Sequence, residues 1–128
     1  MNTARSCPFC ITDDAVLANT LAYARLDKFP VTPGHLLIIP RRHESNFFAT
    51  RPDELEANWA LVVEGKTLLD SKFHPDGYNL RVNVGEMAGQ TIAHAHLHLI
   101  PRYRGDVEQP RGGVRGVIPA QQQYEQRT

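Results

Sequence analysis

Three histidines alternate with small apolar residues in the last third of the chain, as His94, Ala95, His96, Leu97 and His98. Side chains along a strand point to opposite faces in turn, so the three imidazoles are predicted to share one face. Imidazole titrates near neutral pH and can act as a nucleophile, a proton carrier or a metal ligand. We therefore expect the chemistry of this protein to lie along the histidine row.

Three interpretations of the row are open from spacing alone. The histidines could have only a structural role in a strand, with every ring nitrogen hydrogen-bonded. Two of them, ~6.6 Å apart along a strand, could share a zinc ion with a third ligand from elsewhere, whereas the outer pair spans ~13 Å. One could instead be a nucleophile beside a proton-donating neighbour. Asn83, Gln90 and Thr91 lie just before the row, and their neutral donors suit phosphate oxygens, which favours the nucleophile.

The elements that must position this row follow from periodicity and turn residues. Apolar alternation predicts strands over residues 17–19, 21–27, 78–84 and 94–103, and a continuous apolar run of strand length predicts another over 35–40. Thr50 can cap a helix over 52–73, with Pro52 and two acids in its first turn. Apolar residues recur at helical spacing along one face of that helix, namely Leu55, Trp59, Val62, Val63, Leu69 and Phe73. The pattern predicts an α+β fold with a mostly antiparallel sheet.

Length and composition limit the number of domains and the kinds of partner that we expect. The 128 residues, 41% of them hydrophobic, indicate one globular domain over 1–128, with a Gly-, Pro- and Arg-rich loop and tail over 105–128. The net charge of zero gives no reason to expect a nucleic-acid or membrane partner, although eleven arginines against three lysines mildly favour an anionic substrate. The first ten residues lack the apolar core of a signal peptide, and no run approaches the ~20 apolar residues of a membrane span. Two cysteines are too few for a disulfide framework. We therefore expect a cytoplasmic protein.

Two blocks of sequence carry a resemblance to a known family. The block over 83–102, NVGEMAGQTIAHAHLHLIPR, is similar to the histidine triad (HIT) family of nucleotidyl hydrolases and transferases, whose hallmark alternates three histidines with apolar residues. A second block over 27–43, DKFPVTPGHLLIIPRRH, resembles the first conserved block of that family. The similarity covers roughly residues 7–104. It implies a HIT-like fold with an antiparallel sheet of about five strands and one main helix.

The resemblance also implies an activity. HIT hydrolases cleave nucleoside-phosphate-X, where X is a second nucleotide joined through polyphosphate, an amine or an acyl group. By position, His96 would attack the α-phosphorus and become nucleotidylated, and His98 would contact phosphate oxygens or the leaving group. The backbone carbonyl of His94 would fix the tautomer of His96. Catalysis would need no metal, and we expect a purine nucleotide, with adenosine favoured.

The binding residues carried over by position form three sets. Asn83, Gln90 and Thr91 would hold the phosphate. Asp27 would accept hydrogen bonds from the ribose hydroxyls. Phe9 and Leu26 would line the base pocket.

A separate pair, Cys7 and Cys10, has the spacing of a redox pair or a metal knuckle. The absence of a thioredoxin-like βαβ pattern around it weakens the redox interpretation. By resemblance, some HIT proteins complete a structural zinc site with histidines that match His43 and His94 here. In that case His94 would brace the strand and leave His96 and His98 for chemistry. Two reduced thiols packed near the base pocket are the alternative.

The last two expectations concern the oligomeric state and the C-terminal loop. HIT proteins usually form a twofold homodimer, and the helix over 52–73 with Trp59 fits either that interface or burial within one chain. The loop Gly105–Pro119 carries Arg111 and Arg115, which could close over the outer part of the substrate or lie in solvent.

Two other classes of function stay open from sequence. One is a nucleotide-binding regulatory protein with weak turnover. The other is a zinc hydrolase that uses His94 and His96 as ligands. Removal of metal from the folded protein should abolish the activity of the zinc hydrolase alone.

Overall fold

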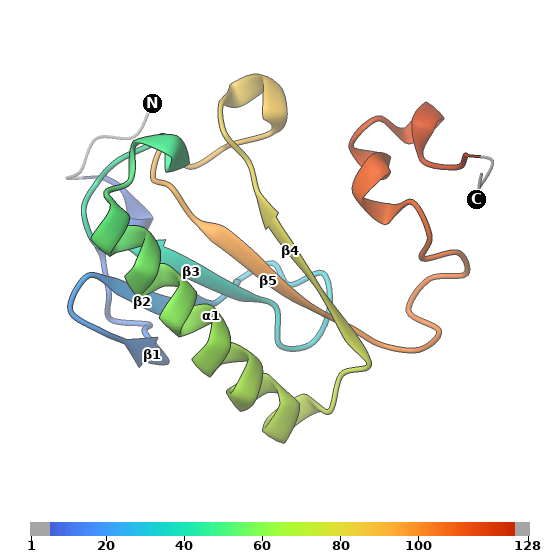
Figure 1. The fold of residues 1–128 in the computed structure, drawn as a ribbon, viewed down its shortest axis with the longest axis horizontal. Helices are drawn as coiled ribbons and strands as arrows, with labels where there is room; N and C mark the ends of the chain where they lie inside the picture. The colour runs from blue at the N-terminus through green and yellow to red at the C-terminus, as the bar shows by residue number, and fades with distance from the viewer. Residues whose placement is uncertain (1–5, 125–128) are drawn as a thin grey trace.

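One antiparallel sheet with a long helix across one face forms the core of the computed structural model, which describes residues 6–124 (Figure 1). The strands are β1 (Leu17–Ala18), β2 (Ala22–Leu26), β3 (Leu36–Pro40), β4 (Gly77–Val82) and β5 (Leu97–Arg102). Their order across the sheet is β1-β2-β3-β5-β4. The expected α+β class, five strands and single main helix are confirmed.

Helix α1 (Pro52–Phe73) has the predicted bounds, but its N-cap lies one residue after the expected Thr50. The N-cap is Arg51, whose backbone N–H donates to the Glu54 carboxylate at 2.7 Å. The Thr50 hydroxyl instead donates to the carbonyl of Phe47 at 2.7 Å, so it closes the preceding turn. The helix ends at Phe73, and its C-cap His74 adopts a left-handed conformation with φ of 52°.

The apolar stripe expected on α1 divides between two faces. Val62 and Leu69 are buried against the sheet, whereas Leu55, Trp59 and Val63 are exposed. The inward row is completed by Glu54, Asn58, Leu61 and Gly65. Gly65 lies where an added Cβ would approach Leu36 to 2.8 Å, so the helix contacts the sheet closely at this point. The exposed row is therefore a second apolar face, which α1 does not bury within its own chain.

Only the last histidine of the row lies within a strand. The strand predicted over 94–103 begins at Leu97, because its neighbour β4 ends at Val82, the register partner of Leu97. Pro40 has no N–H, and its carbonyl is bound by the ring of His94 at 2.6 Å. His94, at a bend, and His96 therefore precede β5 outside any strand, and the Ala95 N–H donates to the Glu44 carbonyl at 2.6 Å.

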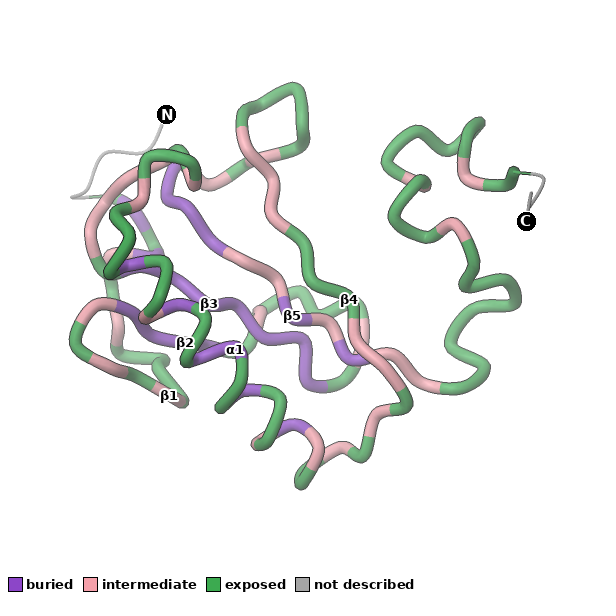
Figure 2. The backbone as a smooth tube through the Cα atoms, viewed as in Figure 1, coloured by how far each residue is buried: buried purple, intermediate pink, exposed green. Residues whose placement is uncertain are grey.

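The segment after β5 forms two short 3-10 helices, η4 (Gly113–Val117) and η5 (Pro119–Gln121), where a loop was expected. This tail is mostly exposed and lies beyond the β4 edge of the sheet (Figure 2). Residues 125–128 of the predicted tail lie outside the described residues. Among the residues described, no helix is long and apolar enough to cross a membrane.

Candidate active site

The ring of His96 is fixed by the backbone just before it. Its Nδ1 lies 2.8 Å from the carbonyl oxygen of His94, so Nδ1 carries the proton and donates it. A neutral imidazole has one proton, which leaves the lone pair of Nε2 available for attack. The ring is buried in a T-shaped contact with the Phe9 ring, with centroids 4.9 Å apart. This burial lowers the pKa of His96, so the ring is neutral near pH 7.

His98 is held by a histidine that the sequence analysis did not select. The N–H of Val31 donates to His35 Nδ1 at 3.2 Å, which places the proton of a neutral His35 on Nε2. His35 Nε2 lies 2.9 Å from His98 Nδ1 and donates to it. His98 therefore carries its own proton on Nε2 and is a donor beside His96, with ring centroids 5.1 Å apart. Burial, followed by the nearby His96 and His35, lowers the pKa of His98 to about 4.

Asp27 joins the same group of side chains. Its Oδ2 lies 3.4 Å from His35 Nε2, and its Oδ1 accepts from the N–H of Phe29 at 3.0 Å. The acid expected to bind ribose is thus connected to His98 through His35. The signal for His35 in the sequence was a lone histidine after Gly34, at the start of an apolar run that becomes a buried strand.

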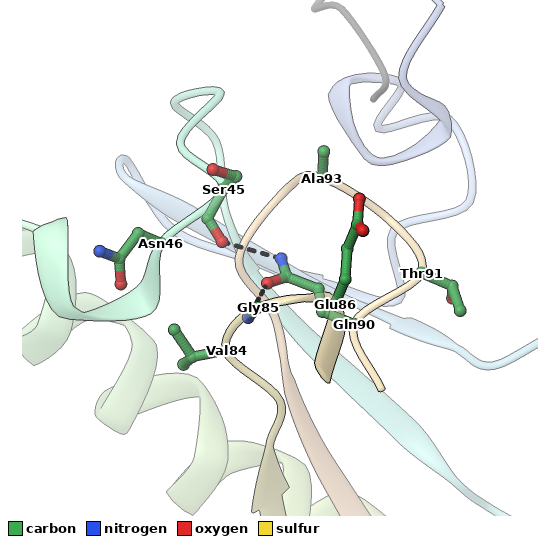
Figure 3. Close-up of a pocket in the computed structure, with 8 residues that line it drawn as sticks. All are labelled: Ser45, Asn46, Val84, Gly85, Glu86, Gln90, Thr91 and Ala93. Carbon is green, nitrogen blue, oxygen red and sulfur yellow. Dashed lines mark hydrogen bonds between the residues drawn. The ribbon is translucent and has the colours of Figure 1, made fainter. Parts of the chain in front are cut away.

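Gln90, expected to bind phosphate, is engaged in holding two loops together. Its side-chain oxygen accepts from the N–H of Gly85 at 2.9 Å (Figure 3). Its amide nitrogen donates to the carbonyls of Ser45 at 2.8 Å and Ile92 at 3.0 Å. Gln90 as a direct phosphate ligand stays a prediction, but this carboxamide already shapes the loop that leads into the histidine segment.

The other predicted binding residues surround the row from several elements. Phe9 contacts His96 from the short 3-10 helix η1 (Pro8–Cys10), and Leu26 lies exposed at the end of β2, next to Asp27. Asn83 follows β4, where its Oδ1 accepts from Arg81 Nε at 3.3 Å. Thr91 lines a hollow of about 350 Å³ beside the row (Figure 3), together with Ser45, Asn46, Val84, Gly85, Glu86, Gln90 and Ala93.

Four potential metal ligands come together behind the row, with all ligand atoms of Cys7, Cys10, His43 and His94 within 4.8 Å of one another. Cys10 Sγ lies 3.2 Å from His43 Nδ1 and 3.5 Å from His94 Nδ1, and Cys7 Sγ lies 3.4 Å from His94 Nδ1. In tetrahedral zinc sites, bond lengths to sulfur and nitrogen separate these ligands by about 3.6 Å. The cluster therefore has the ligand set and spacing of a structural zinc site.

The surroundings of His94 suit a metal ligand. Its Nε2 donates to the Pro40 carbonyl at 2.6 Å, so the lone pair of Nδ1 points toward the two thiols. Burial, followed by the adjacent Cys7 thiol, raises the pKa of Cys10 to about 11. A thiol with so high a pKa keeps its proton at neutral pH, and a divalent cation would stabilise the thiolate instead.

The catalytic zinc site with His94 and His96 as ligands finds little support in this geometry. Within residues 6–124, the groups of three or more metal-ligating side chains are the cysteine-histidine cluster and the set Asp27, His35 and His98. Neither group contains His96. The short contact between His35 and His98 is a hydrogen bond between imidazoles, which accounts for the second group.

The free energy of unfolding is expected to fall as the pH drops from about 7 toward about 5. Burial lowers the pKa of His35 and His98 in the folded chain, whereas histidines in the unfolded chain bind protons near pH ~6.5. Below that pH the unfolded state binds more protons, so acid removes stability by up to ~1.4 kcal/mol per pH unit for each such histidine. Urea unfolding should be measured at several pH values in this range. The free energy of unfolding should change less with pH in His98→Asn than in the wild type. The control His74→Asn, at an exposed histidine, should keep the pH dependence of the wild type.

Comparisons with known proteins place this geometry in context. The family model described as HIT domain matches residues 9–105. An uncharacterized HIT-like protein of Mycoplasma genitalium is 40% identical over 80% of this chain and 77% of its own length. A bis(5'-adenosyl)-triphosphatase of Dictyostelium discoideum is 30% identical over 84% of this chain and 73% of its own length.

Solved structures are similar over the same region. A HIT family protein from Bacillus anthracis superposes with a TM-score of 0.75 at 39% identity, covering 81% of this chain and 78% of that one. A zinc-bound histidine triad family protein from Mycobacterium smegmatis superposes with a TM-score of 0.74 at 30% identity, covering 84% of this chain and 82% of that one.

Proposed function

This chain belongs to the HIT domain family, and from that premise we propose that it is a nucleotidyl hydrolase. Its substrate would have the form nucleoside-phosphate-X, with X a second nucleotide joined through polyphosphate, an amine or an acyl group. The reaction would pass through a covalent nucleotidyl-His96 intermediate. The observation that carries the proposal is the 2.8 Å contact of His96 Nδ1 with the His94 carbonyl, which leaves Nε2 as the nucleophilic atom.

The chemistry follows from the two fixed tautomers. His96 Nε2 attacks the α-phosphorus, a nitrogen–phosphorus bond forms, and X leaves with the electron pair of its bond to phosphorus. The N–H of His98 Nε2 donates to a phosphate oxygen or to the departing atom. The nucleotidylated ring is cationic, and the His94 carbonyl stabilises it through the Nδ1 proton. Water then attacks phosphorus, and the nitrogen–phosphorus bond breaks with its electron pair returning to Nε2. The nucleoside monophosphate is released, and the proton lost by the water balances the proton taken up by X.

The nucleoside would lie on the Asp27 side of the row. Asp27 would accept from the ribose hydroxyls while His35 links it to His98, so ribose binding and orientation of the donor ring are connected. Phe9 and Leu26 would contact the base, and Asn83 and Thr91 would bind the phosphate. The similarity to a bis(5'-adenosyl)-triphosphatase favours adenosine as the nucleoside.

Mass spectrometry of the intact protein tests the proposal. The protein is mixed with a diadenosine polyphosphate or with adenosine 5'-phosphoramidate and quenched in the first turnovers. We expect an added mass of one AMP on the wild type, together with release of AMP on longer incubation. Nucleotide binding without any adduct or turnover would point instead to the regulatory protein that the sequence left open.

We also propose that Cys7, Cys10, His43 and His94 hold a structural zinc ion. The fit of their ligand atoms supports this assignment, as does the similarity to a zinc-bound relative. When bound, the metal would cross-link the N-terminal segment, the residues after β3 and the segment before β5. No step of the hydrolysis passes through it, because His94 acts on His96 through its backbone carbonyl.

The exposed apolar row on α1 predicts a homodimer. Leu55, Trp59 and Val63 are 49%, 58% and 52% exposed, and their spacing of four residues places them side by side on the helix. Light scattering at low micromolar concentration should give about twice the chain mass of 14.4 kDa. Trp59→Glu should shift the protein toward the monomer, whereas the exposed control Glu64→Gln should not. A wild-type monomer at that concentration would contradict the prediction.

A further inference from the structure

A hollow of about 790 Å³ lies between the β4 edge of the sheet and the tail. We call it the tail hollow. Its lining consists of Asn79, Leu80, Arg81, Val82, Asn83, Met87, Ala88, Gly89, Ile100, Arg102, Gly113, Val114, Val117 and Ile118. Small-molecule sites in proteins commonly enclose ~300–1,000 Å³, so the tail hollow is large enough for a ligand.

The tail hollow lies on the sheet face that carries His98. Side chains at alternate positions of β5 share one face of the sheet, so Ile100 and Arg102 lie on the same face as His98. Arg81 is the register partner of His98, which brings their side chains to the same face of neighbouring strands. Arg81 therefore lines the hollow and is also the cross-strand neighbour of the proposed donor, which places the hollow next to the expected position of the leaving group.

The charge available in the tail hollow comes from Arg81. Arg102 is neutralised by Asp106, to which its Nε and Nη2 donate at 2.8 Å, and it also donates to Asn79 at 2.7 Å. Arg81 is exposed, and no acid among the described residues lies within ion-pair distance of it. Its guanidinium can thus bind an anionic group of a ligand.

The tail contributes apolar surface to the tail hollow. Val114, Val117 and Ile118 are all largely exposed and line it from η4 and the residue after. Arg111 and Arg115, which were predicted to close over the outer part of the substrate, do not line the tail hollow. Arg115 donates to the Gln121 carbonyl at 2.9 Å and stacks 4.6 Å above the ring of Tyr124, so it is engaged within the tail.

We propose that the tail hollow is the leaving-group subsite of this hydrolase, an inference that rests on the proposed function. Arg81 binds phosphate beyond the attacked phosphorus, and Val114, Val117 and Ile118 cover a flat apolar body such as a second base. The leaving group that matches this combination of one cation and an apolar wall is a second nucleotide joined through polyphosphate. A small amine would leave both features without a partner.

The test compares two substrates that share the attacked AMP but differ in the leaving group. Diadenosine tetraphosphate would occupy the tail hollow, and adenosine 5'-phosphoramidate would not. For Arg81→Gln we expect the ratio of kcat/KM for the tetraphosphate to that for the phosphoramidate to fall by about 10- to 100-fold, as expected for loss of charge-assisted hydrogen bonds. Val117→Asp, which places a negative charge on the opposite wall, should lower the same ratio.

Arg104→Gln is the matched control, because Arg104 is an exposed arginine that does not line the tail hollow. Its substrate ratio should equal that of the wild type. An unchanged ratio in Arg81→Gln, or a wild type that cleaves the phosphoramidate but not the tetraphosphate, would overturn the subsite. Absence of turnover on both substrates in the wild type would instead overturn the proposed function.

Discussion

His96→Ala is expected to lower kcat by at least ~10³-fold and to abolish the AMP adduct, because it removes the atom that forms the bond to phosphorus. The loss should be this large because the ring lies buried in one fixed orientation, with Nδ1 bound to the His94 carbonyl and the Phe9 ring in T-shaped contact with it. A solvent molecule in its place would lack that orientation. Single-turnover rates and intact-protein mass, measured on the same preparation, separate the chemical step from product release.

The matched control for this variant is His74→Asn, since His74 is an exposed histidine after α1 and asparagine tolerates its left-handed backbone. The control should react at the wild-type rate. AMP affinity, measured by calorimetry, should change little in His96→Ala, because the proposed ribose and phosphate contacts lie on other residues. A turnover rate of His96→Ala within tenfold of the wild-type rate would contradict the covalent mechanism.

The fold followed from sequence wherever local periodicity and packing agreed. The five strands and the helix over 52–73 were predicted, because turn residues and apolar alternation marked them individually. The start of β5 was placed three residues too early, since alternation continues through His94 and Ala95 while the partner strand β4 ends at Val82, opposite Leu97. The end of a strand is set by its neighbour in the sheet, and the pattern within one strand does not contain that information.

The kind of chemistry at the site could be predicted from sequence, but only some of the contacts between its side chains could. The histidine alternation and the cysteine pair pointed to catalysis and to a metal, and the structure brings Cys7 and Cys10 to His43 and His94. His35 was missed because its role depends on a contact with His98, 63 residues away. The apolar residues of α1 were similarly ambiguous, because helical spacing groups neighbouring rows without showing which row meets the sheet.

Protein purified without chelator is expected to contain one zinc ion per chain, and its removal should lower Tm by more than about 10 °C. The size of the effect follows from what the four ligands connect. Cys7 and Cys10 come from the N-terminal segment, His43 follows β3, and His94 precedes β5. Metal binding would cross-link all three, and a loss of several kcal/mol of binding free energy corresponds to a shift of this order in a domain of this size. Cys7→Ser combined with Cys10→Ser should abolish zinc binding and give the same lower Tm.

The effect of zinc removal on activity should be far smaller than that of His96→Ala. The metal would act on the nucleophile only by holding the His94 ring, and with it the carbonyl that binds His96 Nδ1. Below the lowered Tm, the chelated protein should therefore still form the AMP adduct, at a rate reduced by about tenfold. Thiol labelling supplies the control, because the only two cysteines of the chain belong to the cluster and should react rapidly only after chelation. Complete loss of the adduct in a folded, chelated protein would return the zinc hydrolase to consideration. Zinc far below one per chain, unchanged on adding metal, would leave the cysteines as packed thiols.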